Sequence, residues 1–488
     1  MNTATTAPVA PEEAQSVAPI VSWTAPIGLG ILAVLGTITF GVFSGTKNAA
    51  FGLVDTGREA SALAAWLAFA VALVAAAWLG YTWYRESRAG GSAARWVPPA
   101  LAAAVVVFLL AILGVAGVTV ITLSAPFIGW LASIAMLAVA GWSVWLAPRG
   151  RKLPRWAVAV FAVAFLVGFL VWIVAGGRDA TPYISLAGLL AGAVTLAVPL
   201  VFGSLSGVLC ERSGIVNIAI EGQLLMGAFS AAVGATVTGS VYAGLIAAAV
   251  AGALVSLVLA VVSIKYLVNQ IIVGVVLNVL VVGLTNFLFS TLLTANPDGL
   301  NKPPHLGSIE IPVLADVPLI GPILFRQSLV GYLMYVAVIV VYVGLFHTRW
   351  GLRVRAVGEH PQAADTLGVN VNRTRFWNTI LGGAVAGIGG SFFTLVAVDA
   401  FSKEMSAGRG YIALAALIFG RWNPIGAFLA SLLFGFADNL QSVITIIGSP
   451  VPSQFMAMLP YVVTVFAVAG LVGRSRPPAM EGIPYVKG

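Results

Sequence analysis

Long apolar stretches separated by short polar loops run through most of this chain, and they predict its secondary structure. Each stretch is long enough for a helix to cross a bilayer core of ~30 Å. The spans expected on this basis are, by residue number, about 26–43, 60–83, 97–122, 127–147, 157–176, 183–209, 216–238, 241–264, 270–292, 328–346, 376–397, 424–441 and 454–472. The pattern therefore predicts an all-α polytopic membrane protein.

One apolar stretch, residues 411–420, is about half the ~20 residues that a helical crossing needs. Its length alone favours a re-entrant or broken helix. A crossing, however, would place the last basic residues on the same side as the basic loop 347–375, in keeping with the positive-inside bias. These residues are Arg474, Arg476 and Lys487. We therefore favour a short, broken crossing.

Composition agrees with a membrane protein and narrows the chemistry. The chain is 60% hydrophobic and only 9% charged, whereas a soluble protein has about 25% charged residues. The net charge of +8 is explained by basic loops near 84–96 and 148–156, which place these loops and the N-terminus in the cytoplasm. One cysteine and three scattered histidines provide neither a disulfide framework nor a metal site.

The most basic passage, residues 347–375, contains a short helix signal. Pro361 suits the first position of a helix, and Gly368 suits the residue just beyond its end. The helix between them has about two turns, too few to be stable alone in water. We expect the membrane scaffold to present this helix to a soluble partner.

Acidic residues inside spans are candidates for function, because a charge at membrane depth costs about 2.5–3.5 kcal/mol on insertion scales. Glu221 is the main example, and Asp438 lies near a span end. Asn217 precedes Glu221 by four residues, so we expect both on one helix face. Glu221 is then either part of a substrate pathway or a buried hydrogen-bond hub between helices.

Side-chain amides are the second set of candidates. They both donate and accept hydrogen bonds, which suits neutral polar ligands, although they also bond helices to one another in membranes. Asn278 and Asn286 are eight residues apart, close to one helical face. The amides assigned to a substrate pathway are Asn217, Asn269, Gln270, Asn278 and Asn286, together with Glu221. The spacing of Gly383 and Gly387 favours close helix packing.

Three motifs resemble a known family. Residues 211–222 read ERSGIVNIAIEG, residues 355–371 read RAVGEHPQAADTLGVNV, and residues 408–424 read GRGYIALAALIFGRWNP. They resemble ABC importer permeases of the branched-chain amino acid, sugar and nucleoside group, most closely the nucleoside type. The match covers roughly 183–475. Ala219 stands where the family often has Gly, and residues 26–176 have no counterpart in the usual permease core.

The resemblance implies a type II ABC importer-like permease core with about five extra N-terminal helices. Residues 1–25 are rich in Ala, Pro, Thr and Glu, and we expect them to form a disordered cytoplasmic tail. The resemblance implies an accessory membrane region at 26–180 and the core at 181–475 with its coupling segment 347–375. The positive-inside bias favours a cytoplasmic tail at 476–488. The residues expected to couple to an ATPase are Arg355, Gly358, Glu359, Pro361, Ala363, Ala364, Leu367 and Gly368.

The resemblance also implies partners: ATPase subunits, a second permease that is homologous or identical, and an extracytoplasmic substrate-binding lipoprotein, all at the cell membrane. This chain has no G-x-x-x-x-G-K-[ST] motif, so ATP and Mg²⁺ are expected on the ATPase and no cofactor on this chain. The expected substrate is a nucleoside. Sugar or branched-chain amino acid permeases, a gradient-driven carrier that uses Glu221, and a membrane-embedded enzyme remain alternatives.

Overall fold

A computed structural model describes residues 23–44, 47–52, 120–151, 153–176, 183–317, 320–447, 458 and 477–486. Among these residues, ten helices are long and apolar enough to cross a membrane. The chain therefore has the all-α, multi-pass architecture that the apolar pattern predicts. The expected spans at 60–83 and 454–472, and most of the one at 97–122, lie outside the described residues.

The chain forms two compact units, and the described part of the first comprises residues 23–44, 47–49, 122–151 and 153–176. Its helices are α1 (Thr24–Gly36, continued by a π-helical turn to Val42), α4 (Ala125–Leu146, ending in a 3-10 turn to Arg149) and α5 (Arg155–Ala175). Phe40 lies in its core, with its ring 5.4 Å from Phe165 and 6.3 Å from Trp172. Aromatic packing of this kind holds three helices whose outer faces are themselves apolar.

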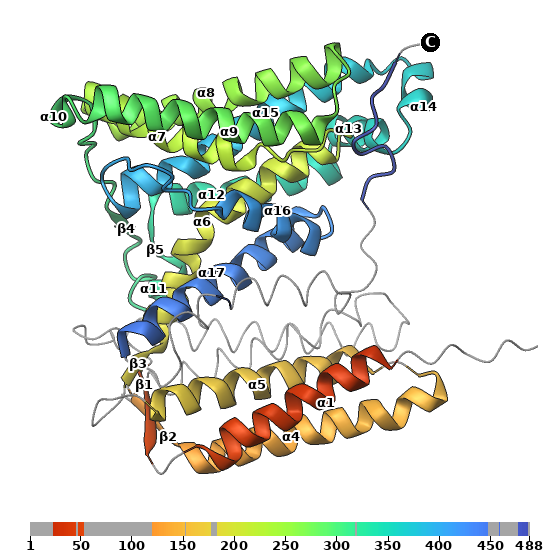
Figure 1. The fold of residues 1–488 in the computed structure, drawn as a ribbon, viewed down its shortest axis with the longest axis vertical. Helices are drawn as coiled ribbons and strands as arrows, with labels where there is room; N and C mark the ends of the chain where they lie inside the picture. The colour runs from red at the N-terminus through yellow and green to blue at the C-terminus, as the bar shows by residue number, and fades with distance from the viewer. Residues whose placement is uncertain are drawn as a thin grey trace, which may run out of the picture. The chain divides into compact units, whose positions relative to one another are not determined.

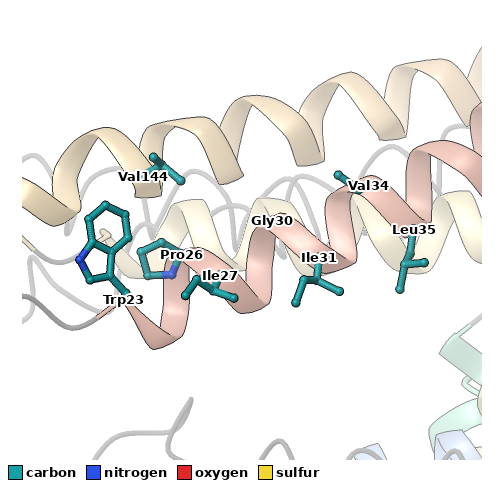
Figure 2. Close-up of a pocket in the computed structure, with 8 residues that line it drawn as sticks. All are labelled: Trp23, Pro26, Ile27, Gly30, Ile31, Val34, Leu35 and Val144. Carbon is teal, nitrogen blue, oxygen red and sulfur yellow. The ribbon is translucent and has the colours of Figure 1, made fainter.

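A shallow apolar groove follows α1 and includes Val144 of α4 (Figure 2). Its lining residues are Trp23, Pro26, Ile27, Gly30, Ile31, Val34, Leu35 and Val144. Figure 2 shows Ile31 and Leu35 pointing away from α4. An apolar outer surface of this kind is compatible with contact to lipid chains.

The second unit contains the remaining long helices (Figure 1). They are α6 (Leu186–Glu211), α7 (Ile220–Thr238), α8 (Val241–Ala260, with a π turn to Lys265), α9 (Gln270–Leu288, with a π turn to Leu293), α12 (Leu329–His347), α13 (Arg349–Glu359), α14 (Pro361–Thr366), α15 (Val371–Phe392, with a π turn to Ala397), α16 (Arg409–Phe419) and α17 (Pro424–Ile447).

Short strands occur only in connections, as far as the described residues go. β1 (Asn48–Gly52) pairs in parallel with β3 (Tyr183–Ser185), and β2 is Val120–Ser124. In the long loop after α9, β4 (Ser308–Glu310) pairs antiparallel with β5 (Arg326–Ser328), between the short helices α10 (Pro297–Leu300) and α11 (Ile320–Leu324).

Small residues allow α8 and α15 to approach closely. A Cβ built on Gly383 would lie 2.4 Å from the carbonyl oxygen of Gly252, and one on Gly387 would lie 2.1 Å from that of Ala248. Such contacts leave no room for a side chain, and they are the usual basis of helix packing in membranes, where burial of apolar surface drives little association. The packing role expected for Gly383 and Gly387 is confirmed.

The second unit has two distinct ends. Figure 1 shows α13, α14 and the C-terminal segment at one end of α7–α9, which we call the coupling end, and α10 at the opposite end. The turn after α6 belongs to the coupling end, because a Cβ on Gly358 of α13 would lie 2.3 Å from the carbonyl oxygen of Arg212. At the opposite end, Lys302 N donates to Thr236 Oγ1 at 3.0 Å.

The segment from residue 398 to residue 422 connects these two ends without one continuous helix. Phe401 N donates to Asn301 Oδ1 (2.7 Å) at the opposite end, and Arg212 Nε donates to the Trp422 carbonyl (2.9 Å) at the coupling end. Only the second half, α16, is helical. The geometry supports a broken crossing over a re-entrant loop.

Candidate functional site

Glu221 lies in the first turn of α7 and contacts the N-terminus of α16. Its Oε1 accepts hydrogen bonds from Ser406 Oγ (2.7 Å) and Gly408 N (2.8 Å), and its Oε2 accepts one from Gly410 N (2.6 Å). The first N–H groups of a helix lack intrahelical partners and carry partial positive charge, so they suit a carboxylate. Glu221 is 7% exposed and joins α7 to the break before α16.

Asn278 of α9 also contacts the starts of α7 and α16. Its Oδ1 accepts from Gly222 N at 2.8 Å, and its Nδ2 donates to the Ile218 carbonyl at 2.9 Å and to the Tyr411 hydroxyl at 3.3 Å. Gly222 N is among the N–H groups at the start of α7 that have no intrahelical partner. Asn278 therefore ties α9 to the starts of both α7 and α16.

Asn217 lies elsewhere than the sequence predicts. It precedes α7, which begins at Ile220, so it does not share a helix face with Glu221. Its amide exchanges hydrogen bonds with Gln223 at 3.0 and 3.1 Å and donates to Ser206 Oγ at 3.0 Å. Gln223 in turn donates to Ser256 Oγ at 2.8 Å. The prediction of a shared face was wrong because the buried turn after α6 is not helical.

This second cluster has the properties of a structural contact. Its four side chains are fully buried, and they come from α6, the following turn, α7 and α8: Ser206, Asn217, Gln223 and Ser256. Buried polar groups that satisfy one another hold helices together. Asn217 therefore fits the helix-bonding alternative better than a substrate pathway.

The other predicted amides lie at the two ends of α9. Asn269 is exposed and caps the helix by accepting from Ile271 N at 2.9 Å, and Gln270 is buried and accepts from Val216 N at 2.7 Å. Asn286 lies two turns beyond Asn278 and donates to Glu404 Oε1 at 3.2 Å. Of the six predicted residues, Glu221, Asn278 and Asn286 face the segment that leads into α16.

Sequence reasoning missed a charged pair beside this segment. Arg409 Nη2 lies 3.2 Å from Asp438 Oδ2, and the guanidinium lies 5.5 Å from the Phe393 ring centre. Both side chains are partly exposed. Asp438 was noted as acidic near a span end, but its partner is 29 residues away and only the packing of α16 on α17 brings the two together. Tyr411, which is 50% exposed, was also missed.

The coupling segment forms two helices. α13 contacts α12 and α15, and its Arg355 guanidinium lies 5.1 Å from the Phe346 ring centre. In α14, Pro361 and Ala364 are buried, and Ala364 packs with Val357 and Val371. Ala363 and Leu367 face outward, and Leu367 is 84% exposed.

These placements divide the eight predicted coupling residues. Ala364 is enclosed by its own chain, so the expectation that it forms part of a docking face does not fit the structure. Gly358 and Pro361 are also buried, whereas Glu359, Ala363, Leu367 and Gly368 are exposed. An exposed leucine directly after a helix of six residues is the feature that a partner surface would cover. No cluster of metal-binding side chains occurs among the described residues.

Comparison with known proteins agrees with this geometry. Residues 189–468, more than half of the chain, match the model of the branched-chain amino acid transport system / permease component family. The chain belongs to this permease family. It is 39% identical over 308 residues to the nucleoside ABC transporter permease protein NupC of Lactococcus lactis, covering 61% of this chain and 96% of NupC.

Two further relatives are similar over the same region. The guanosine ABC transporter permease protein NupQ of Bacillus subtilis is 38% identical over 309 residues, covering 60% of this chain and 94% of NupQ. The putative glucose ABC transporter permease protein TsgC13 of Haloferax volcanii is 35% identical over 255 residues, covering 52% of this chain and 77% of that protein. No solved structure matches the chain.

In this permease, two of the three sequence motifs meet at the site. The motif at 211–222 forms the turn after α6 and the start of α7, and the motif at 408–424 forms α16 and the turn that follows it. Their contact is the carboxylate of Glu221. The motif at 355–371 forms the end of α13 and all of α14, at the coupling end.

Proposed function

We propose that this protein is the transmembrane subunit of an ATP-driven ABC importer for nucleosides. The observation that carries the proposal is the match to NupC and NupQ over almost their whole length, at 39% and 38% identity. These relatives are transport subunits by name, in keeping with a chain that moves a solute and leaves ATP hydrolysis to a partner.

A pathway along α9 and the segment before α16 fits the chemistry of a nucleoside. The Asn286–Glu404 pair lies toward the opposite end, and Tyr411 with Asn278 lies deeper. Amides can donate hydrogen bonds to ribose hydroxyls and base edges and accept them, and carboxylates can accept them. The exposed ring of Tyr411 offers a stacking surface, which is worth about 1–3 kcal/mol per base in other complexes.

The energy source and the partners complete the proposal. The exposed face of α14 would dock on an ATPase subunit that holds ATP and Mg²⁺, and the coupling end would then face the cytoplasm. The proposal includes cytoplasmic N- and C-termini. A second permease, homologous or identical, would face the pathway, and a substrate-binding lipoprotein would deliver the solute from outside. The division into an accessory region before residue 181 and a permease core after it belongs to the same proposal.

The test is nucleoside uptake by cells in which the proton gradient is collapsed and ATP is maintained. We expect uptake to persist. The alternative, a carrier that uses Glu221 to move protons, predicts that uptake stops, and that result would overturn the ABC assignment.

Glu221→Gln provides a second comparison of the two mechanisms. All three groups around the carboxyl donate hydrogen bonds to it, so its role at the start of α16 is that of an acceptor, and glutamine keeps one acceptor oxygen there. We therefore expect ATP-driven uptake to remain, normalised to the amount in the membrane, with reduced thermal stability.

Competition settles the substrate class. Unlabelled nucleosides should suppress uptake of labelled guanosine, whereas ribose, glucose and leucine in the same excess should not. Uptake of a labelled sugar or of labelled leucine, with no uptake of labelled guanosine, would move the protein to another branch of its family.

A further inference from the structure

The C-terminal segment 477–486 lies against the coupling helices. Met480 N donates to the Gly358 carbonyl at 3.0 Å, and Ala479 N donates to Glu359 Oε2 at 3.2 Å. Carbonyl groups in the last turn of a helix have no intrahelical partner, so the segment completes the hydrogen bonding at the end of α13. Tyr485 packs against the apolar cluster that includes Ala364 of α14.

The same segment also contacts the turn after α6 and the start of α15. Gly482 N donates to the Gly214 carbonyl at 3.2 Å, and Arg375 Nη1 donates to the Ile483 carbonyl at 2.8 Å. Arg375 is 2% exposed, and its Nε and Nη2 have no hydrogen-bond partner among the described residues. The segment therefore provides the only acceptor that the described residues offer to a buried guanidinium.

Glu481 extends this contact to the end of α6. Its carboxyl interacts electrostatically with Glu211, the last residue of α6, and with Arg212. Glu211 is 2% exposed and accepts a hydrogen bond from Trp422 Nε1 at the end of the broken crossing.

The six-residue helix α14 cannot transmit a displacement by itself, because so short a helix has little stability of its own. Transmission needs contacts that hold it to the helices that must move. α14 contributes only a small apolar face to the cluster around Ala364. Segment 477–486, in contrast, forms hydrogen bonds to three elements, α13, α15 and the turn before α7. That turn leads directly to Glu221 and the broken crossing.

We propose that segment 477–486 is a positioning element for energy coupling, which ties α13 and α14 to the end of α6 so that movement of the docked helix reaches the Glu221 site. The proposal rests on the proposed ATP-driven function. Its residues touch neither substrate nor nucleotide. They act through α14 and through the turn after α6.

The first experiment compares two truncations in the full transporter. A chain that ends at Arg476 lacks the whole segment, and a chain that ends at Val486 lacks only the last two residues. For the shorter chain we expect normal membrane levels and continued co-purification with the ATPase, because the outer face of α14 is unchanged, but at least a fivefold loss of nucleoside uptake. The control should transport normally, and full uptake by the shorter chain would overturn the proposal.

A second variant keeps the test valid if the shorter chain does not insert. Tyr485→Ala removes the ring from the Ala364 cluster without shortening the protein, and its exposed neighbour Val486→Ala serves as the matched control. We expect Tyr485→Ala, at normal membrane levels, to lower uptake severalfold and to lower ATP turnover stimulated by substrate less than uptake. Equal uptake by both variants would count against a coupling role.

Cross-linking tests the docking independently of transport. Glu359→Cys and Ala479→Cys place thiols on two exposed, adjacent residues, and the native Cys210 is buried. A short bifunctional thiol reagent should join them in the full chain. No cross-link would refute the docked segment, whereas a cross-link in a protein whose uptake does not need ATP would refute the proposed function alone.

Discussion

Glu221 shows how a carboxyl group inside an apolar span is accommodated by hydrogen bonds. Three donors from the start of α16 satisfy both oxygens, so the carboxylate replaces the turn of helix that is missing before Arg409. The same arrangement, a broken helix whose N-terminus faces a negative group, recurs at binding sites in transporters. Asn278 and Tyr411 adjoin this point, and Tyr411 is the most exposed of the three.

The ring of Tyr411 provides the first prediction. Tyr411→Ala removes the stacking surface and should lower nucleoside uptake about tenfold, consistent with a stacking energy of about 1–3 kcal/mol. Tyr411→Phe keeps the ring and loses only the hydroxyl that accepts from Asn278, so it should lose less than threefold. Initial uptake rates, divided by membrane level, provide the comparison. Equal losses would mean that the hydroxyl matters and the ring does not.

The broken crossing is the element on which the site depends. α16 approaches α7 so closely that a Cβ on Gly410 would lie 2.5 Å from the backbone of Glu221. Backbone atoms cannot move aside as a flexible side chain can. The separation of the two helices, and with it the bond from Gly410 N to the carboxylate, therefore depends on this residue having no side chain.

Gly410→Ala should therefore force α16 away from α7 and destabilise the protein by about 1–3 kcal/mol, the usual range for overpacking. Gly283→Ala in α9 is the matched control, since nothing lies within 4 Å of a Cβ built at that residue. That change should be neutral or should stabilise the helix by up to about 1 kcal/mol. Thermal unfolding in detergent measures both. A stable Gly410→Ala variant with normal uptake would remove the close contact from the mechanism.

The outer face of α14 leads to a prediction for the coupling helices. Leu367→Asp puts a charge on a leucine that is 84% exposed, so the fold should be unaffected while docking to an ATPase is lost. Val313→Asp makes the same change at an exposed apolar residue of the loop between α10 and α11, and it should have no effect on docking. Co-purification of the ATPase distinguishes them. Retention by Leu367→Asp would place the docking surface elsewhere.

At the scale of the whole molecule, the C-terminal segment brings charges from several elements together. Glu481 faces Glu211 and Arg212 from the end of α6, and Arg355 and Glu359 of α13 act in turn on Arg212. Nearby, Arg375 of α15 bonds to Ile483, and Tyr485 lies beside Asp365 of α14. Burial, more than any single charge, raises the pKa of Glu481 to about 7 from its ordinary value of 4.5.

This pKa predicts that docking of the segment depends on pH. An acid whose pKa is raised in the docked state favours docking at low pH, and the advantage declines as the pH rises from about 4.5 to about 7. Linkage gives at most about a tenfold weaker docking equilibrium at pH 8 than at pH 6, less where solvent screens the group. The yield of the cross-link between positions 359 and 479 should fall accordingly.

Glu481→Gln cannot ionise, and its cross-link yield should stay level between pH 6 and pH 8. The conservative variant Glu481→Asp should retain the dependence. A yield that is flat in the wild type, or that falls equally in Glu481→Gln, would show that another group controls docking.

Several helices of this protein could be predicted from the local sequence, because insertion of a stretch into a bilayer depends on its length and polarity. The long helices, the short helix from Pro361 to Thr366, and the break before α16 all follow from such local patterns. Glu221 stood out for the same reason, as a charge inside an apolar span. Even so, the sequence could not decide whether Glu221 belongs to a substrate pathway or is a hydrogen-bond hub, since it does not show which donors surround the carboxyl group.

Only the tertiary structure decided which polar groups face one another. Asn217 looked like a companion of Glu221 at helical spacing, yet the buried turn after α6 directs it to Gln223 and Ser206. Ala364 looked suited to a docking face, yet its burial by residues from α13, α15 and the distant C-terminal segment turns it inward. Residues separated by tens to hundreds of positions come into contact because helices pack through complementary shape and small residues. The periodicity of a single segment does not predict such contacts.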